Sequence, residues 1–356
     1  MKYSGNKMDR DFKVNNFDLL RLFAALEVVL LHSYPHLNLP YPEFFKVILN
    51  FPGVTMFFVM SGFLISASLE RNQDLGVYFK NRAFRIFPAL WTCIILTVIV
   101  IASITNISFL NVQAIYWFIA QLVGLIYTPA FLKSFGFGSY NGSLWTIPLE
   151  LQFYVVLPIL YFLINKLSAK RLVRTIFLAI IFLLFCIITY LLKVHYDADN
   201  FSFNNIPKPL RYSFIPNIYL FLFGVLMQRL NIYKSNLIYG KGLFWLIGYL
   251  AISYLIPTSN TTYIFKLLCL GVATISFAYT LPTLSKKIFK GNDISYGVYI
   301  YHGLVLGVVV QLHLLNNSLY ILVILGTTIL LATLSWLCIE KPIMKIKRKT
   351  TLTKAA

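Results

Sequence analysis

Ten long apolar runs constrain the fold of this chain more than any other feature of its sequence. A helix of about 20 apolar residues is long enough to cross the hydrocarbon core of a membrane. The runs are continuous rather than alternating, which argues against a membrane β-barrel. Together with 58% hydrophobic and 12% charged residues, they predict an all-α, polytopic membrane protein. The expected spans are 17–34, 51–69, 87–105, 143–165, 174–193, 212–229, 242–257, 263–281, 294–313 and 319–339.

The distribution of basic residues predicts the orientation of these spans. With ten spans, the loops and ends on one side carry 24 Lys and Arg residues and the loops on the other side carry four. Basic loops face the cytoplasm, so both termini are expected there. If an eleventh apolar stretch, 112–132, crossed the membrane completely, the basic loops after it would lie on the side opposite the cytoplasm. We therefore predict that it is a re-entrant or interfacial segment, broken by Gly124 and Pro129.

The expected organisation has three parts, a cytoplasmic basic head (1–16), a single transmembrane domain (17–340) and a cytoplasmic basic tail (341–356). The first span follows a charged head and has no small-residue cleavage site behind it, so we expect it to be retained. The basic residues behind the net charge of +19 lie mainly in the expected cytoplasmic loops and ends. No segment is long enough to form a soluble basic face, which argues against nucleic-acid binding.

The first span, FDLLRLFAALEVVLLH, carries the ionisable residues Asp18, Arg21, Glu27 and His32. Such groups are costly inside a membrane and indicate a functional site by default. Arg21 and His32 are eleven residues apart, which places them about 20° apart on one helix face and about 16 Å apart along the axis. In the alternative interpretation, Arg21 extends to the membrane surface and His32 is a hydrogen-bonded core histidine.

Ionisable groups also border the cytoplasmic ends of later spans. Arg82 and Arg85 would share a face if their segment is helical, and with Lys80 they could form an anion site. Arginine is suited to bidentate phosphate contacts, although simple anchoring of the loop explains the same residues. At the end of the chain, we interpret Glu340 and Pro342 as a helix stop.

Two further polar features lie within spans. Glu150 needs a cation or hydrogen-bond donors around it, and Arg21 is a plausible partner. Tyr296, Tyr299 and His302 recur every three residues and would form a polar ridge on one helix face. For the tyrosines, an interfacial aromatic belt is an equal alternative. A histidine can act as a general base or an acyl carrier, so these patterns suit transfer of an activated group without fixing the reaction.

Five sequence blocks follow one another along the chain, and they are FDLLRLFAALEVVLLH, GVTMFFVMSGFLIS, YFKNRAFRIFP, SLWTIPLELQFYVVLP and ISYGVYIYH. In this order they resemble the membrane-bound acyltransferase family 3, which O-acylates bacterial surface polysaccharides and related sugars. Two positions depart from the family pattern, Thr55 where Asp is common and Pro148 in the fourth block.

The resemblance implies an O-acetyltransferase in the bacterial cytoplasmic (inner) membrane. Its donor co-substrate would be cytoplasmic acetyl-CoA, and its acceptor a hydroxyl on a surface polysaccharide, lipopolysaccharide or lipid-linked sugar across the membrane. A thioester is already activated, so no metal and no permanently bound cofactor are expected. Membrane lipid is the other expected partner, and a homodimer is left open. The chain is expected to lack the fused extracytoplasmic hydrolase-like domain that some members carry.

The resemblance also implies roles for individual residues. His32 would act as the general base or carry the acetyl group transiently, and Arg21 and Glu150 would position the donor or the histidine. Asp18 belongs to the same catalytic set. The expected donor-binding residues are Lys80, Arg82, Arg85, Tyr299 and His302.

Two other functions fit an intramembrane set of Arg, His and Glu. A transporter or flippase of a lipid-linked sugar would also place such residues along a substrate pathway, but the chain shows no internal repeat. A polysaccharide polymerase would be expected to have a large extracytoplasmic loop. The longest such loop here, 105–142, is mostly apolar.

Overall fold

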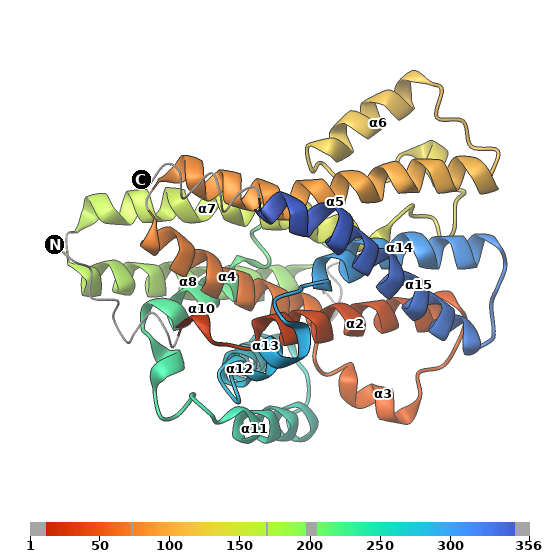
Figure 1. The fold of residues 1–356 in the computed structure, drawn as a ribbon. Coiled ribbons are helices and arrows are strands. Elements are labelled where there is room, and N and C mark those ends of the chain that lie inside the picture. The colour runs from red at the N-terminus through yellow and green to blue at the C-terminus, as the bar shows by residue number, and fades with distance from the viewer. Residues whose placement is uncertain (1–11, 73, 169, 197–204, 346–356) are drawn as a thin grey trace. The chain divides into compact units, whose positions relative to one another are not determined.

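A computed structural model describes residues 12–72, 74–168, 170–196 and 205–345, and these residues form helices and connecting turns without any strand (Figure 1). The chain forms two compact units. Unit 1 comprises the residues up to Phe23 together with 50–71 and 155–291, and unit 2 comprises 24–49, 72–154 and the residues from Asn292 onward. Helices α2 (Phe17–His36) and α7 (Thr146–Leu167) each contribute residues to both units.

Each of the other elements belongs to one of the two units. Unit 1 contains α4 (Gly53–Arg71), α8 (Arg171–His195), α9 (Lys208–Arg211), α10 (Ile218–Arg229), η3 (Ile232–Lys234), α11 (Gly242–Leu255), α12 (Asn260–Ala278) and α13 (Leu284–Phe289). Unit 2 contains α3 (Glu43–Ile48), α5 (Leu75–Ile104), α6 (Val112–Leu122), η1 (Ala130–Leu132), η2 (Gly142–Trp145), α14 (Ser295–Gln311), α15 (Leu319–Ser335) and the π-helical turn η4 (Trp336–Glu340).

The all-α, multi-pass prediction is confirmed, whereas the number of ten crossings stays a prediction. Within the described residues, six helical segments are long and apolar enough to span a membrane. Four shorter apolar helices, α6, α10, α11 and α14, correspond to further expected spans or to the expected re-entrant segment. The ends of the chain, 1–11 and 346–356, lie outside the described residues, and so does most of the basic head and tail.

The third span was expected to begin at residue 87, but its helix, α5, already begins at Leu75. Asp74 explains the difference, because its side chain accepts a hydrogen bond from the backbone N–H of Val77 and caps the helix. The helix then continues through Pro88 to Ile104. Arg82 and Arg85 therefore lie on a helix, three residues apart, and share a helix face as expected for a helical segment.

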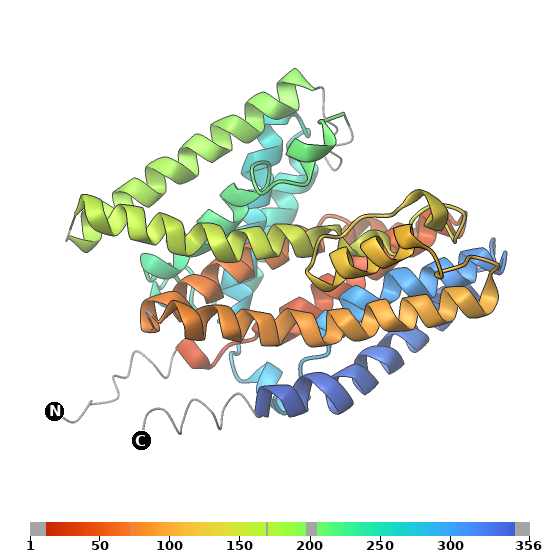
Figure 2. The same ribbon diagram turned by 90° about the horizontal axis from the view of Figure 1, so that it is seen from above.

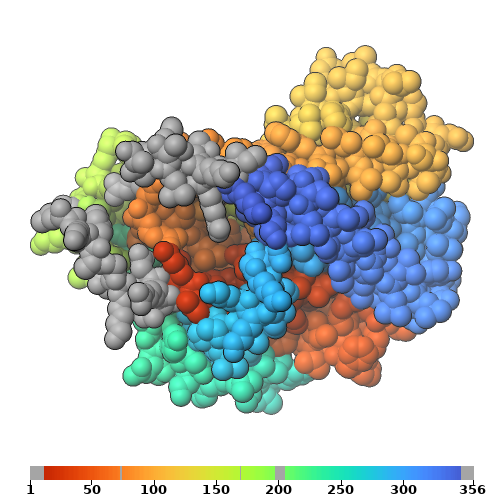
Figure 3. Space-filling view, viewed as in Figure 1, coloured from red at the N-terminus to blue at the C-terminus, as the bar shows by residue number. Residues whose placement is uncertain are grey.

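The stretch 112–132 forms a short helix and then turns. Helix α6 has 11 residues, a length of about 16 Å that is too short for a crossing. Trp117 and Gln121 are buried on one side of it, while Ile115 and Tyr116 are exposed on the other. Figure 3 shows this segment, in yellow, at the surface of the molecule. The short helix supports a segment that does not cross the membrane completely. Whether the segment is re-entrant or interfacial stays a prediction.

The predicted helix stop at Glu340 and Pro342 is also wrong. Helix α15 passes into the π-helical turn η4, and helical backbone then continues to Lys345. In a regular α-helix the Pro342 ring would clash with the carbonyl group of residue 338. That carbonyl belongs to the wider π-helical turn, which can accommodate the ring.

The core of unit 1 is built on α4 and α10, which pack backbone to backbone. A Cβ atom on Gly62 would overlap the carbonyl oxygen of Phe221, and one on Gly224 would overlap the carbonyl oxygen of Val59. Gly62 and Gly224 therefore let the two helices approach closely.

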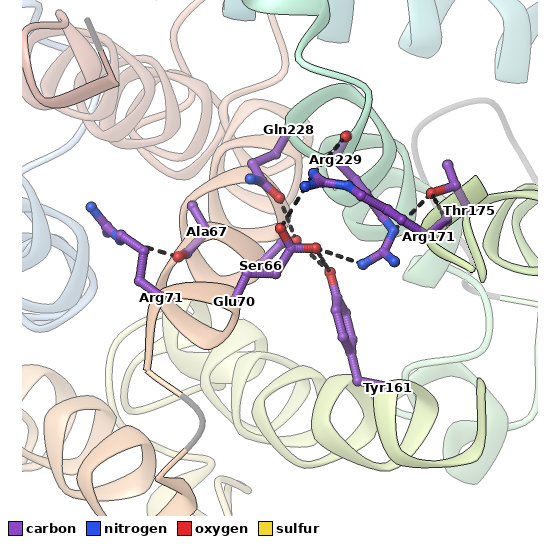
Figure 4. A network of polar contacts seen from close by, with 9 residues as sticks. All are labelled: Ser66, Ala67, Glu70, Arg71, Tyr161, Arg171, Thr175, Gln228 and Arg229. Carbon is purple, nitrogen blue, oxygen red and sulfur yellow. Dashed lines mark hydrogen bonds and ion pairs between the residues drawn. The ribbon is translucent and has the colours of Figure 1, made fainter. Parts of the chain in front are cut away.

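An ion pair between a buried arginine and a half-buried glutamate joins the helices of unit 1 beyond these glycines (Figure 4). Arg229 Nη1 lies 2.5 Å from Glu70 Oε1, and Tyr161 donates a hydrogen bond of 3.1 Å to the same oxygen. Arg171 lies 3.7 Å from the other carboxylate oxygen. The Arg229 side chain is only 6% exposed, whereas that of Arg171 is 61% exposed. Glu70 thus neutralises a buried cation and connects α4, α7, α8 and α10.

Helix α14 forms the core of unit 2 and is buried along nearly its whole length. Figures 1 and 2 show it running beside α15. Three glycines explain the close packing, because a Cβ atom at any of them would meet a neighbouring segment within 3 Å. Gly297 faces Ala332 of α15, Gly303 faces the side chain of Asn141, and Gly307 faces that of Phe135.

Candidate active site

The side chains of His32 and His302 meet inside unit 2. His32 Nδ1 lies 3.1 Å from His302 Nε2, a hydrogen-bonding distance, and the two ring planes are inclined by 29°. His302 is fully buried and His32 is half-buried. The structure thus brings together the predicted catalytic histidine on α2 and a residue predicted to bind the donor on α14.

The loop before α7 holds the part of α14 that carries His302. Asn141 donates a hydrogen bond of 2.7 Å to the carbonyl oxygen of Ile300. Its side-chain oxygen accepts hydrogen bonds from Ser143 and fills the position that a side chain on Gly303 would need. Sequence reasoning missed Asn141, and the only signal for it was its place in the glycine-rich segment before a span.

Tyr299 contributes to the same attachment. Its hydroxyl donates a hydrogen bond of 2.8 Å to the carbonyl oxygen of Ser143 and lies 2.7 Å from Oγ1 of Thr146. Its ring contacts His302 in an edge arrangement. The structure therefore gives Tyr299 a role in packing α14 against η2 and α7, and its predicted contact with the donor stays a prediction.

We expect Gly303→Ala to destabilise the protein by about 1–3 kcal/mol, because the added methyl group must displace the Asn141 side chain. The matched control is Gly326→Ala on α15, where a Cβ atom meets nothing within 4 Å; this change should be neutral or stabilise the helix by up to about 1 kcal/mol. Unfolding of the purified proteins in detergent would measure both effects. Equal stability of the two variants would contradict the proposed packing.

The remaining predicted catalytic residues lie on α2 and α7. Arg21 forms an ion pair of 2.9 Å with Asp18, one turn away on the same helix. Glu150 is half-buried and accepts a hydrogen bond from the Tyr154 hydroxyl. Arg21 lies in unit 1 and Glu150 in unit 2, and their pairing stays a prediction.

The three predicted phosphate ligands on α5 have different surroundings. Arg85 donates a hydrogen bond of 2.6 Å to Asp293 and forms an ion pair with it. The guanidinium group of Arg82 lies 5.7 Å from the ring centres of Tyr78 and Tyr154, as in cation–π contacts. Its Nε atom is buried without a hydrogen-bond partner among the described residues. Lys80 is exposed.

Two acidic residues near Arg85 were missed as parts of this region. Asp293 binds Arg85 with one oxygen and accepts hydrogen bonds from Ser295 with the other, at the start of α14. An Asp two residues before a Ser is a pattern that favours such a local turn, in which the Asp side chain accepts from the backbone two residues on. Glu340 is buried and accepts a hydrogen bond from Ser335. The sequence alone gave no sign of the π-helical turn that places it there.

A family model described as an acyltransferase domain matches residues 14–340. The chain belongs to the acyltransferase 3 family. It is 29% identical to nodulation protein 10 of Rhizobium leguminosarum biovar viciae, over 94% of each chain. It is 28% identical to an O-acetyl transferase of Shigella phage Sf6, over 92% of this chain and 96% of that one.

A third relative, the peptidoglycan O-acetyltransferase OatA of Listeria monocytogenes, is 29% identical over 41% of this chain and 24% of its own length. No solved structure is significantly similar to the chain. Membership of the acyltransferase 3 family, together with these O-acetyltransferase relatives, identifies the protein as an enzyme that acylates hydroxyl groups. The apolar helices and the family together indicate a multi-pass membrane protein.

Proposed function

We propose that this acyltransferase 3 protein moves an acetyl group from cytoplasmic acetyl-CoA to a sugar hydroxyl of a surface polysaccharide or lipopolysaccharide, and that it works in the bacterial cytoplasmic membrane. The contact between His32 and His302 carries the proposal. It supplies a half-buried imidazole on α2, hydrogen-bonded to a fully buried second one on α14. The O-acetyltransferase relatives support acetyl as the group transferred.

Two routes place His32 at the reacting atoms. As a general base, the imidazole takes the proton from the acceptor hydroxyl while the oxygen attacks the thioester carbonyl. The carbon–sulfur bond then breaks, and the CoA sulfur leaves with the proton that the imidazolium returns. As a carrier, the imidazole itself attacks the thioester and holds the acetyl group after CoA leaves. The sugar oxygen then attacks that group, the carbon–nitrogen bond breaks, and the hydroxyl proton is released.

The arginines of α5 are proposed to bind the CoA phosphates. We expect Arg85→Ala to raise the apparent KM for acetyl-CoA by about tenfold or more, because a hydrogen bond to a charged group contributes about 1.5–3 kcal/mol. Transfer of radiolabelled acetyl groups in membrane vesicles measures this value. Asp293→Asn is the control, since it removes the partner charge and keeps the guanidinium group. If both variants leave the KM unchanged, Arg85 has a structural role.

The surface glycan separates this function from the alternatives. Cells lacking the gene should make glycan of normal amount and length without its ester-linked acetyl groups, which NMR of the purified glycan would detect. Loss of a flippase would reduce the amount of glycan, and loss of a polymerase would shorten its chains. Either of those results, with acetyl groups retained, would overturn the proposal.

A further inference from the structure

We infer that His302 is a positioning residue that fixes the proton of His32 on Nδ1 and thereby makes Nε2 of His32 the reactive atom. The inference rests on the proposed function, because it assigns an atom to the acyl transfer. It follows from a chain of two hydrogen bonds within unit 2, which leads from a backbone carbonyl group to the ring of His32.

The first step fixes the proton on His302. Its Nδ1 atom lies 3.3 Å from the carbonyl oxygen of Val298, one turn earlier on α14. A carbonyl oxygen can only accept a hydrogen bond, so Nδ1 of His302 carries a proton. The side chain is fully buried, and a buried unpaired charge costs several kcal/mol, which favours the neutral ring. A neutral imidazole has one N–H group, and Nε2 of His302 therefore presents a lone pair.

The second hydrogen bond fixes the position of the proton on His32. Nε2 of His302 lies 3.1 Å from Nδ1 of His32. Because Nε2 of His302 presents a lone pair, Nδ1 of His32 must donate the hydrogen bond. The single proton of a neutral His32 is therefore on Nδ1. The lone pair of His32 is then on Nε2. That atom has no hydrogen-bond partner among the described residues, and His32 is half-buried as a residue.

This arrangement suits both proposed routes. Whether Nε2 of His32 takes the hydroxyl proton or attacks the thioester carbon, positive charge develops on its ring. The Nδ1–H group of that ring then donates more strongly to the lone pair of His302, which stabilises the charged state. Serine hydrolases use a carboxylate in the same position, where the correct tautomer is worth about 10⁴-fold in kcat. Here a neutral imidazole would serve as the acceptor.

The test compares His302→Gln with His302→Met in the full-length protein. The two side chains have similar length and flexibility, but only the Gln oxygen can replace the lone pair of Nε2 as a strong acceptor. Membrane vesicles containing equal amounts of each variant would be supplied with radiolabelled acetyl-CoA and their endogenous glycan acceptor. We expect kcat to fall by at least about 100-fold for Met and to lie within about tenfold of wild type for Gln.

The outcomes separate the inference from the proposed function. If the wild-type protein transfers no acetyl group, the proposed function fails. If the wild type is active and the Met variant matches it, or the Gln variant is as inactive as the Met variant, His302 does not act as the acceptor and the inference fails. A fall in kcat for Met that Gln reverses would support the inference, because loss of packing alone would not distinguish these side chains.

A spectroscopic measurement on the wild-type protein tests the same point without relying on a variant. The chain has 5 histidines, so nitrogen-15 NMR of histidine-labelled protein can be assigned by removing one histidine at a time. We expect His32 and His302 both to be neutral with the proton on Nδ1, the tautomer that the hydrogen-bond chain requires. A proton on Nε2 of either ring would overturn the inference, whatever the activities of the variants.

Discussion

Replacing His32 with alanine should lower acetyl transfer by about 10²–10⁴-fold, the usual contribution of a general base, and by more if His32 carries the acetyl group. The reason is that the half-buried imidazole on α2 is the group proposed to react. The fold should survive, because the change removes a side chain that hydrogen-bonds only His302 among the described residues. Ester-linked acetyl on the surface glycan, measured by NMR against total sugar, gives the result.

The neighbouring histidine provides the control for this experiment. His36 lies one turn after His32 on α2 and stacks on the ring of Phe137, 4.1 Å away. His36→Ala removes an imidazole of the same kind from the same helix, and it should leave acetylation close to wild type while reducing stability through lost packing. Wild-type acetylation in the His32 variant would remove that residue from the chemistry. Equal loss in both variants would instead indicate damage to the helix end.

The fold was predictable where it depends on apolar length and on charge. Continuous apolar runs predicted the membrane helices, and the break at Gly124 in 112–132 predicted a segment that ends early. The errors lie where local chemistry decides. Asp74 starts a helix in a segment whose basic composition resembles a loop, and the π-helical turn carries the chain past Pro342. Neither hydrophobic periodicity nor composition predicts a side-chain helix cap or a π-helical turn.

The candidate site was predictable as a set of residues but not as an arrangement. His32 stood out because an ionisable group inside a span is costly. Its partner His302 was recognised as functional and assigned to the donor, because sequence spacing cannot report a contact between residues 270 positions apart. The same limit applies to Arg85 and Asp293, which are 208 positions apart. Long-range pairs of this kind require the fold.

The largest effect on stability should come from Glu70→Ala in unit 1. This change leaves the guanidinium group of Arg229, which is 6% exposed, without the carboxylate 2.5 Å away. Removing one partner of a buried ion pair costs about 3–5 kcal/mol, because the other charge stays buried without compensation. We expect a correspondingly lower free energy of unfolding for the purified protein in detergent, followed by tryptophan fluorescence during denaturation.

Two further variants identify the cause of this loss. Arg171→Ala removes the exposed partner, 3.7 Å from the same carboxylate, and should cost at most about 1 kcal/mol, as exposed ion pairs do. The double variant Glu70→Ala/Arg229→Met removes both charges and should recover much of the stability, because an apolar side chain can fill the site without a desolvation penalty. If the double variant is as unstable as Glu70→Ala alone, the cost comes instead from the hydrogen bonds that Glu70 makes, such as the one from Tyr161.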